Sequence, residues 1–87
     1  MQEITAEDRK IVREIILGYF ELFENKSFTR QHVYDIALAD RDMPRIEDKQ
    51  GVVAQEFDQL LLETRIRVVG GSGEKELIQL KPVRYHR

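Results

Sequence analysis

The apolar residues of this chain change their spacing once, near Arg65, and that change limits the folds the chain can adopt. Before Arg65 they recur three and four positions apart, which is the spacing of helices with one buried face. After Arg65 they alternate with polar residues over 65–69 and again over 76–80, which is typical of two strands. The glycine-rich stretch 70–73 between them favours a turn. We therefore expect helices followed by a C-terminal β-hairpin.

Breaks in the helical pattern predict three helices, at about 5–24, 29–40 and 44–64. Thr5 and Thr29 are placed to begin the first two, because a threonine hydroxyl accepts a hydrogen bond from a free amide in the first turn.

The start of the third helix stays open between two positions. Pro44 suits the first turn of a new helix, whereas Asp42 and Asp48 are both suitable capping residues. The segment 27–29 is expected to be a short extended connector.

The hairpin is expected over 65–81, with a basic tail at 82–87. Matching the apolar faces of its strands pairs Ile66 with Leu80 and Val68 with Ile78, all facing inward. On the second helix, Val33, Ile36 and Ala37 are expected to face the core.

The composition is that of a globular domain, and the absence of cysteine fits an intracellular protein, although extracellular domains can lack cysteine too. Its 87 residues suffice for one domain, 1–87, and the absence of cysteine excludes disulfides and thiolate metal sites. Apolar runs such as Ile15–Leu17 are far too short to span a bilayer, and the residues after Met1 show no signal-peptide pattern. We expect a cytoplasmic protein without membrane association. The formal net charge of −2 argues against a strongly basic nucleic-acid coat.

The order helix, extended piece, helix, turn, helix, strand, glycine-rich loop, strand resembles the winged helix-turn-helix superfamily. The most specific part is Phe57–Gly71, where a helix passes directly into a strand. The resemblance implies an α+β, mainly helical fold in which the hairpin is the wing. In that family the third helix enters the DNA major groove and the wing contacts the backbone or the minor groove. It also implies a sequence-specific DNA-binding protein, a transcriptional regulator.

Candidate DNA contacts follow from the expected exposed positions. The residues proposed to contact bases are polar residues of the third helix: Lys49, Gln50, Gln55 and Gln59. The residues proposed to contact the DNA backbone are basic residues around that helix: Arg41, Arg45, Arg65, Arg67 and Lys75. Asp48 and Asp58 share the outward face of the helix, and a carboxylate there repels phosphate unless it has its own partner.

The first helix carries more apolar surface than one core face needs, because its apolar residues cover about half of its circumference, with Leu17 outside the arc. Either the domain surrounds the helix on two sides, or Ile11, Ile15 and Leu22 contact a second subunit. The second reading predicts a homodimer that reads two half-sites.

An alternative function is protein–protein interaction through the acidic third helix. A continuous positive rim formed by Arg41, Arg45, Arg67 and Lys75 would favour DNA. Arginines scattered and paired with acids would favour a protein partner.

The residues that would support catalysis or metal binding are sparse. The two histidines, His32 and His86, are far apart and lack a carboxylate cluster, so we expect no metal site, no cofactor and no enzymatic activity. The loop 70–73 leads into a strand rather than a helix, and is therefore not a phosphate-binding loop.

Overall fold

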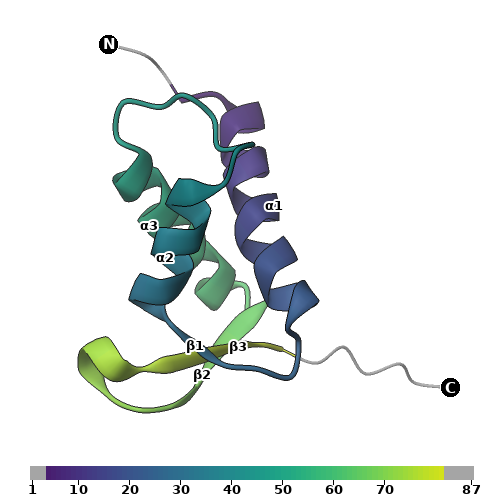
Figure 1. Cartoon of the computed structure of the whole chain (residues 1–87), viewed down its shortest axis with the longest axis vertical. Helices are drawn as coiled ribbons and strands as arrows, with labels where there is room; N and C mark the ends of the chain where they lie inside the picture. Colours follow the sequence, from purple (N-terminus) through teal and green to yellow (C-terminus); the bar gives the residue numbers. More distant parts are fainter. Residues whose placement is uncertain (1–3, 82–87) are drawn as a thin grey trace, which may run out of the picture.

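A computed structural model describes residues 4–81, and the predicted basic tail at 82–87 lies outside this range. The elements are α1 (Ala6–Leu22), β1 (Phe28–Thr29), α2 (Arg30–Ala39), α3 (Lys49–Leu62), β2 (Ile66–Gly70), the short 3₁₀ helix η1 (Gly73–Lys75) and β3 (Leu77–Leu80). The three helices stand together over a small antiparallel sheet at one end of the molecule (Figure 1). The predicted α+β fold class is confirmed.

The starts of α1 and α2 follow the local sequence. The Thr5 hydroxyl accepts a hydrogen bond from the Asp8 amide at 3.0 Å, and the Asp8 carboxylate accepts one from the Thr5 amide at 3.4 Å, which completes a capping box. The Thr29 hydroxyl accepts from the His32 amide at 3.3 Å. Both predicted caps are confirmed.

The third helix begins at the later of its two predicted starts, after Asp48 and not near Pro44. Asp48 is the cap, and its carboxylate accepts a hydrogen bond from the Gly51 amide at 3.1 Å. Pro44 therefore belongs to a loop, 40–48, and the predicted helix 44–64 is too long at its start. In the sequence, Ile46 is in phase with the apolar face of this helix, which favoured the earlier start. Its side chain is indeed buried in the core, but the residue lies outside the helix.

The sheet contains one more strand than the hairpin that the sequence predicted. Its order is β1-β3-β2, and Phe28 of the segment expected as a connector pairs with Ile78. The predicted hairpin register is confirmed, with Ile66 opposite Leu80 and Val68 opposite Ile78. A register shift between Val68 and Gly70 then bends the strand toward the turn.

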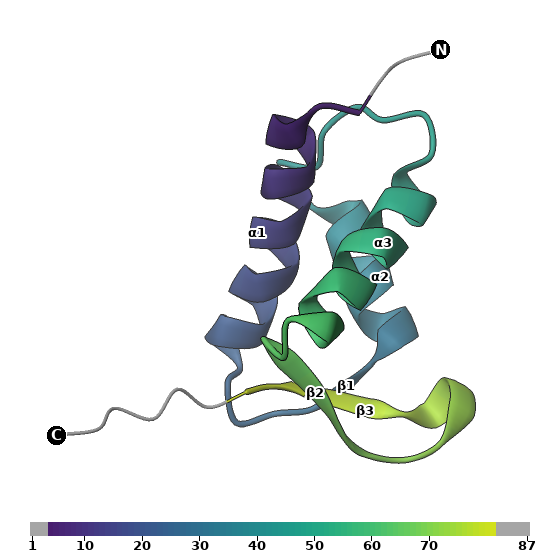
Figure 2. The same cartoon turned by 180° about the vertical axis from the view of Figure 1, so that it is seen from behind.

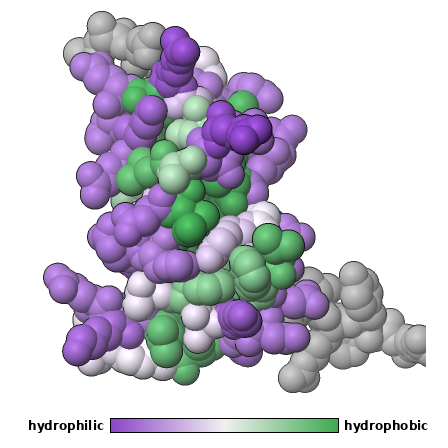
Figure 3. Space-filling view, in the orientation of Figure 1, coloured by the Kyte–Doolittle hydropathy of each residue, from purple (hydrophilic) through white to green (hydrophobic). Residues whose placement is uncertain are grey.

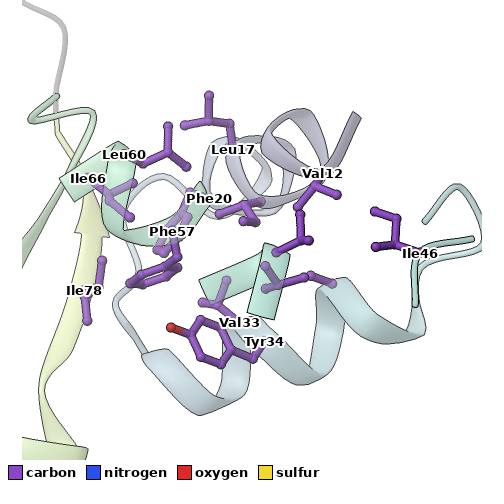
Figure 4. Packing of buried hydrophobic residues seen from close by; sticks show 14 residues of the cluster. Val12, Leu17, Phe20, Val33, Tyr34, Ile46, Phe57, Leu60, Ile66 and Ile78 are labelled. Carbon is purple, nitrogen blue, oxygen red and sulfur yellow. The ribbon is translucent and has the colours of Figure 1, made fainter. Parts of the chain in front are cut away.

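The core fills the space between the three helices and the inner face of the sheet (Figure 4). Phe20 of α1 and Phe57 of α3 are fully buried at its centre, with ring centroids 6.3 Å apart. Burying one such side chain contributes about 1.5–3 kcal/mol. The strands close this core from below through Ile66 and Ile78, both almost fully buried.

Three apolar side chains lie differently from their predicted positions. Leu17 is buried, because α1 packs against α3 as well as α2 (Figure 2). Ile36 and Val68 are exposed, at 36% and 46%. None of the helices within residues 4–81 combines the length and apolar character that a membrane crossing requires.

Candidate functional site

The exposed face of α3 is polar over most of its length. Gln55, Asp58, Gln59 and Leu62 are all exposed, and their spacing of three and four places them on one face. The hairpin follows directly from the end of this helix. We refer to the exposed face of α3, together with the exposed residues of β2 and η1, as the α3–hairpin surface.

Each of three carboxylates on or directly after α3 is paired with an arginine from another helix. Arg9 and Arg13 both belong to α1. Arg9 donates to Glu56 at 3.0 Å, and Arg13 pairs with Glu63. The third pair joins Asp58 to Arg30 of α2 at 2.5 Å. The Arg13–Glu63 and Arg30–Asp58 pairs are partly exposed and contribute only about 0–1 kcal/mol each, whereas Glu56 in the pair with Arg9 is buried. All three pairs offset the negative charge of α3.

Arg30 makes the most contacts of these arginines, and sequence reasoning did not select it. Its guanidinium donates to Asp58 and to the Tyr34 hydroxyl, and lies 4.8 Å from the ring centroid of Phe57. Burial by itself would lower the pKa of Arg30. The hydrogen bonds to Asp58 and Tyr34 together outweigh this effect, so the pKa is raised above its ordinary value and the group stays charged. Asp58 lies 28 positions away in sequence, and no local pattern indicates such a pair.

The two glutamines proposed to read bases are exposed but already make contacts within the chain. The side-chain carbonyl of Gln55 accepts from Arg9 at 3.0 Å, and the side-chain amide of Gln59 donates to Glu63 at 3.1 Å. Each bond uses one end of a side-chain amide, and an amide has both a donor and an acceptor end.

The five basic candidates form two groups rather than one rim. Arg41 and Arg45 lie in the loop before α3, and the exposed Lys49 and Gln50 are the first two residues of the helix. The other three follow the far end of α3: Arg65, Arg67 and Lys75. Since α3 has 14 residues, its two ends are about 20 Å apart. The continuous positive rim is therefore not formed.

These basic residues nevertheless differ from the arginines of the helices. All five are exposed, and none forms an ion pair with another of the described residues. Arg67 lies on the outer face of the sheet, because Ile66 before it points into the core and side chains alternate along a strand.

A groove between α1 and α2 occupies a different part of the molecule. It has a volume of about 400 Å³, and the three residues proposed for a dimer interface, Ile11, Ile15 and Leu22, all line it. Gly18, Tyr19 and Ile36 complete its apolar lining. Figure 3 shows apolar side chains gathered between the helices on this face, with hydrophilic ones on both sides. We call this feature the α1–α2 groove.

The rim of the α1–α2 groove is acidic. Glu14 contributes from α1, and Asp40 and Asp42 contribute from the end of α2 and the loop that follows. Ile36 and these carboxylates were missed from the sequence as parts of one site, because only the packing of α2 against α1 brings them together.

Within residues 4–81, no cluster of three or more histidine, cysteine or acidic side chains could hold a metal ion. His32 instead links α1 and α2, with its Nε2 atom 2.8 Å from the Tyr19 hydroxyl and its ring stacked on Phe28. His86 lies outside the described residues.

Searches of protein-family models, curated proteins and solved structures find no match to this chain.

Proposed function

We propose that this chain is a winged helix domain that binds double-stranded DNA through the α3–hairpin surface. The arrangement of elements supports this proposal: three helices, a short strand before α2, and a hairpin that continues from α3. In a winged helix, the third helix and the hairpin are the parts that face DNA.

The charge distribution around α3 is the observation that carries the proposal. The acids Glu56, Asp58 and Glu63 are each offset by an arginine of α1 or α2. Lys49 and the five basic candidates lie around the same helix and form no ion pair among the described residues. The exposed acids Asp48 and Glu74 in the same region also form no ion pair among the described residues, so the proposal depends on where the unpaired cations lie and not on an excess of positive charge.

The two groups of basic residues suit contacts with phosphates at the two ends of α3. Gln55 and Gln59 lie between these groups on the exposed face, where their amide ends suit adenine edges. Backbone contacts position the protein, and base contacts select the sequence. A homodimer that reads two half-sites stays a prediction.

The test is duplex binding followed by fluorescence anisotropy at a series of salt concentrations. We expect binding at low salt, with Arg67→Ala weakening it for all duplexes and lowering the salt slope by about one unit. The matched control is Lys10→Ala, which removes an exposed cation from α1. We expect this control to leave the slope unchanged.

Selection of duplexes from a random pool then tests the glutamines. On a selected duplex, Gln59→Ala should cost about 1–3 kcal/mol, with little effect on unrelated duplexes. Absence of binding by the folded chain at low salt would contradict the DNA proposal.

A protein partner for the same surface is the second candidate function. Leu62 favours it, because this leucine is 77% exposed at the end of α3. If the chain does not bind DNA, this apolar side chain and its polar surroundings suit a protein interface better than phosphates.

A further inference from the structure

Asp58 belongs to the same exposed face of α3 as the two glutamines proposed to read bases. Gln55 precedes it by three positions and Gln59 follows it directly, and all three residues are exposed. The side chain of Asp58 remains 58% exposed although it pairs with Arg30. The ion pair therefore leaves much of this carboxylate open on the surface that the DNA proposal assigns to base contacts.

The ion pair with Arg30 uses one oxygen of the carboxylate. Arg30 of α2 donates to Oδ1 at 2.5 Å, and Oδ2 makes no hydrogen bond with another of the described residues. Arg30 is itself held by a hydrogen bond to the Tyr34 hydroxyl at 2.9 Å and lies 4.8 Å from the ring centroid of Phe57. Because Tyr34 and Phe57 are buried, the guanidinium is anchored to the core and restricts the rotation of the Asp58 side chain. One carboxylate oxygen is fixed, and the other is available to a ligand.

The helix carries small residues on the turns before Asp58. Ala54 precedes it by four positions and Gly51 by seven, so both lie on the same side of α3. A helical side chain extends over the turn that precedes it. This side of the helix therefore has little side-chain bulk, and the edge of a base can approach the short aspartate side chain closely.

The four bases differ in what their major-groove edges offer to a carboxylate. An ionised carboxylate accepts hydrogen bonds and cannot donate them. Guanine presents two acceptors, thymine presents an acceptor and a methyl group, and adenine presents the acceptor N7 beside its N6 amine. Cytosine presents its N4 amine without a neighbouring acceptor. Because acceptors repel a negative charge, cytosine is the base that suits the carboxylate of Asp58.

We propose that Asp58 reads a cytosine by accepting a hydrogen bond from its N4 amine through Oδ2, with Arg30 as the positioning residue. This inference rests on the proposed function, because it requires α3 to lie in the major groove. Arg30 also offsets the charge of the carboxylate, which reduces the repulsion between Asp58 and the DNA phosphates. The exposed face of α3 then selects cytosine at one position and adenine at the positions that the glutamines contact.

Selection of duplexes from a random pool by the wild-type chain and by Asp58→Asn tests the contact. The asparagine amide both donates and accepts, which suits the N6 and N7 atoms of adenine. We expect the wild-type chain to prefer cytosine about tenfold at one position, and the variant to prefer adenine there. On duplexes of unrelated sequence the variant should instead bind more tightly, because one negative charge is removed.

The matched control is Asp35→Asn. This substitution removes the same charge from an exposed position on α2. We expect it to leave the preferred base unchanged at every position. If both variants changed the preference at the same position, net charge rather than contact with Asp58 would be responsible, and the inference would be wrong.

Two variants of Arg30 test its positioning role. Arg30→Gln removes the charge that holds Asp58, and should remove most of the preference for cytosine at that one position. Arg30→Lys keeps a cation beside the carboxylate, and should retain more of the preference. Thermal denaturation of both variants establishes that they are folded at the temperature of the binding measurement. An equal preference for cytosine in all three chains would contradict the positioning role.

The possible outcomes separate the cytosine contact from DNA binding itself. If the wild-type chain binds duplexes without preferring any base, or prefers the same bases as Asp58→Asn, the cytosine contact is overturned and DNA binding is retained. If the folded wild-type chain binds no duplex at low salt, the proposed function fails and the cytosine contact fails with it.

Discussion

Three carboxylates lie on or directly after α3 and three lie at the rim of the α1–α2 groove, yet the two sets differ in their partners. Arginines of the neighbouring helices offset Glu56, Asp58 and Glu63. Within residues 4–81 no ion pair offsets the three acids of the groove rim. The number of acids on a surface therefore says little about its field, because the placement of arginines on adjacent elements decides it.

The two sides of α1 explain this difference. Arg9 and Arg13 are one turn apart and contact α3, whereas Ile11 and Ile15 line the groove. One helix therefore supplies positive charge to one surface and apolar area to the other. Substitutions that act on one surface and not the other test this separation.

The largest expected effect comes from the core that supports both surfaces. Phe57→Ala removes a fully buried ring that contacts Phe20 and Tyr34. We expect a loss of about 3–5 kcal/mol in the free energy of unfolding, measured by urea denaturation.

The matched control on the same helix is Leu62→Ala. Its side chain is 77% exposed, and we expect a change within about 0.5 kcal/mol. A similar loss in both variants would show that α3 is held by more than its buried face.

The turn of the hairpin belongs to the α3–hairpin surface alone. Gly71 and Gly73 both have positive φ, but only at Gly71 would an added Cβ overlap the backbone of Lys75. We expect Gly73→Ala to cost about 1–2 kcal/mol for its left-handed conformation, and Gly71→Ala to cost more. Thermal denaturation measures both, and equal losses would contradict the predicted steric overlap.

Thr64 joins α3 to β2 in an unfavourable conformation. Its φ is 59°, in the left-handed region that a β-branched residue rarely adopts. We expect Thr64→Gly to raise the free energy of unfolding by about 0.5–1 kcal/mol. Thr64→Ala keeps the Cβ atom and should therefore raise the free energy of unfolding by less than Thr64→Gly. An equal gain in the two variants would mean that the threonine hydroxyl, and not the Cβ atom, is the source of the strain.

The smallest expected effect compares one carboxylate from each surface. Asp58→Asn weakens the pair with Arg30 and should cost about 0.2–1 kcal/mol. It also removes a negative charge from the proposed DNA interface, so binding to unrelated duplexes should become tighter.

Glu14→Gln is the matched control at the groove rim, because Glu14 is exposed on α1 and away from the basic candidates. We expect it to change neither stability nor duplex binding. An equal gain in duplex affinity from both variants would show that net charge, rather than position, controls binding.

Local sequence determined the starts of the helices and the register of the hairpin. Thr5, Thr29 and Asp48 each accept a hydrogen bond from an amide within the first turn, so capping depends on residues three positions apart. The pairing of Ile66 with Leu80 follows because a shift of one residue would expose the apolar face. These features need no knowledge of distant elements.

Only the tertiary structure decided how the surfaces are composed. The pairs Arg9–Glu56 and Arg13–Glu63 join residues 47 and 50 positions apart, and β1 enters the sheet by pairing with β3 from the other end of the chain. The burial of Leu17 and the exposure of Ile36 depend in the same way on where α3 and α2 meet α1. Such contacts depend on how the helices are rotated relative to one another, and the packing of core residues such as Phe20 and Phe57 fixes this rotation. The spacing of apolar residues along the sequence contains no information about the rotation.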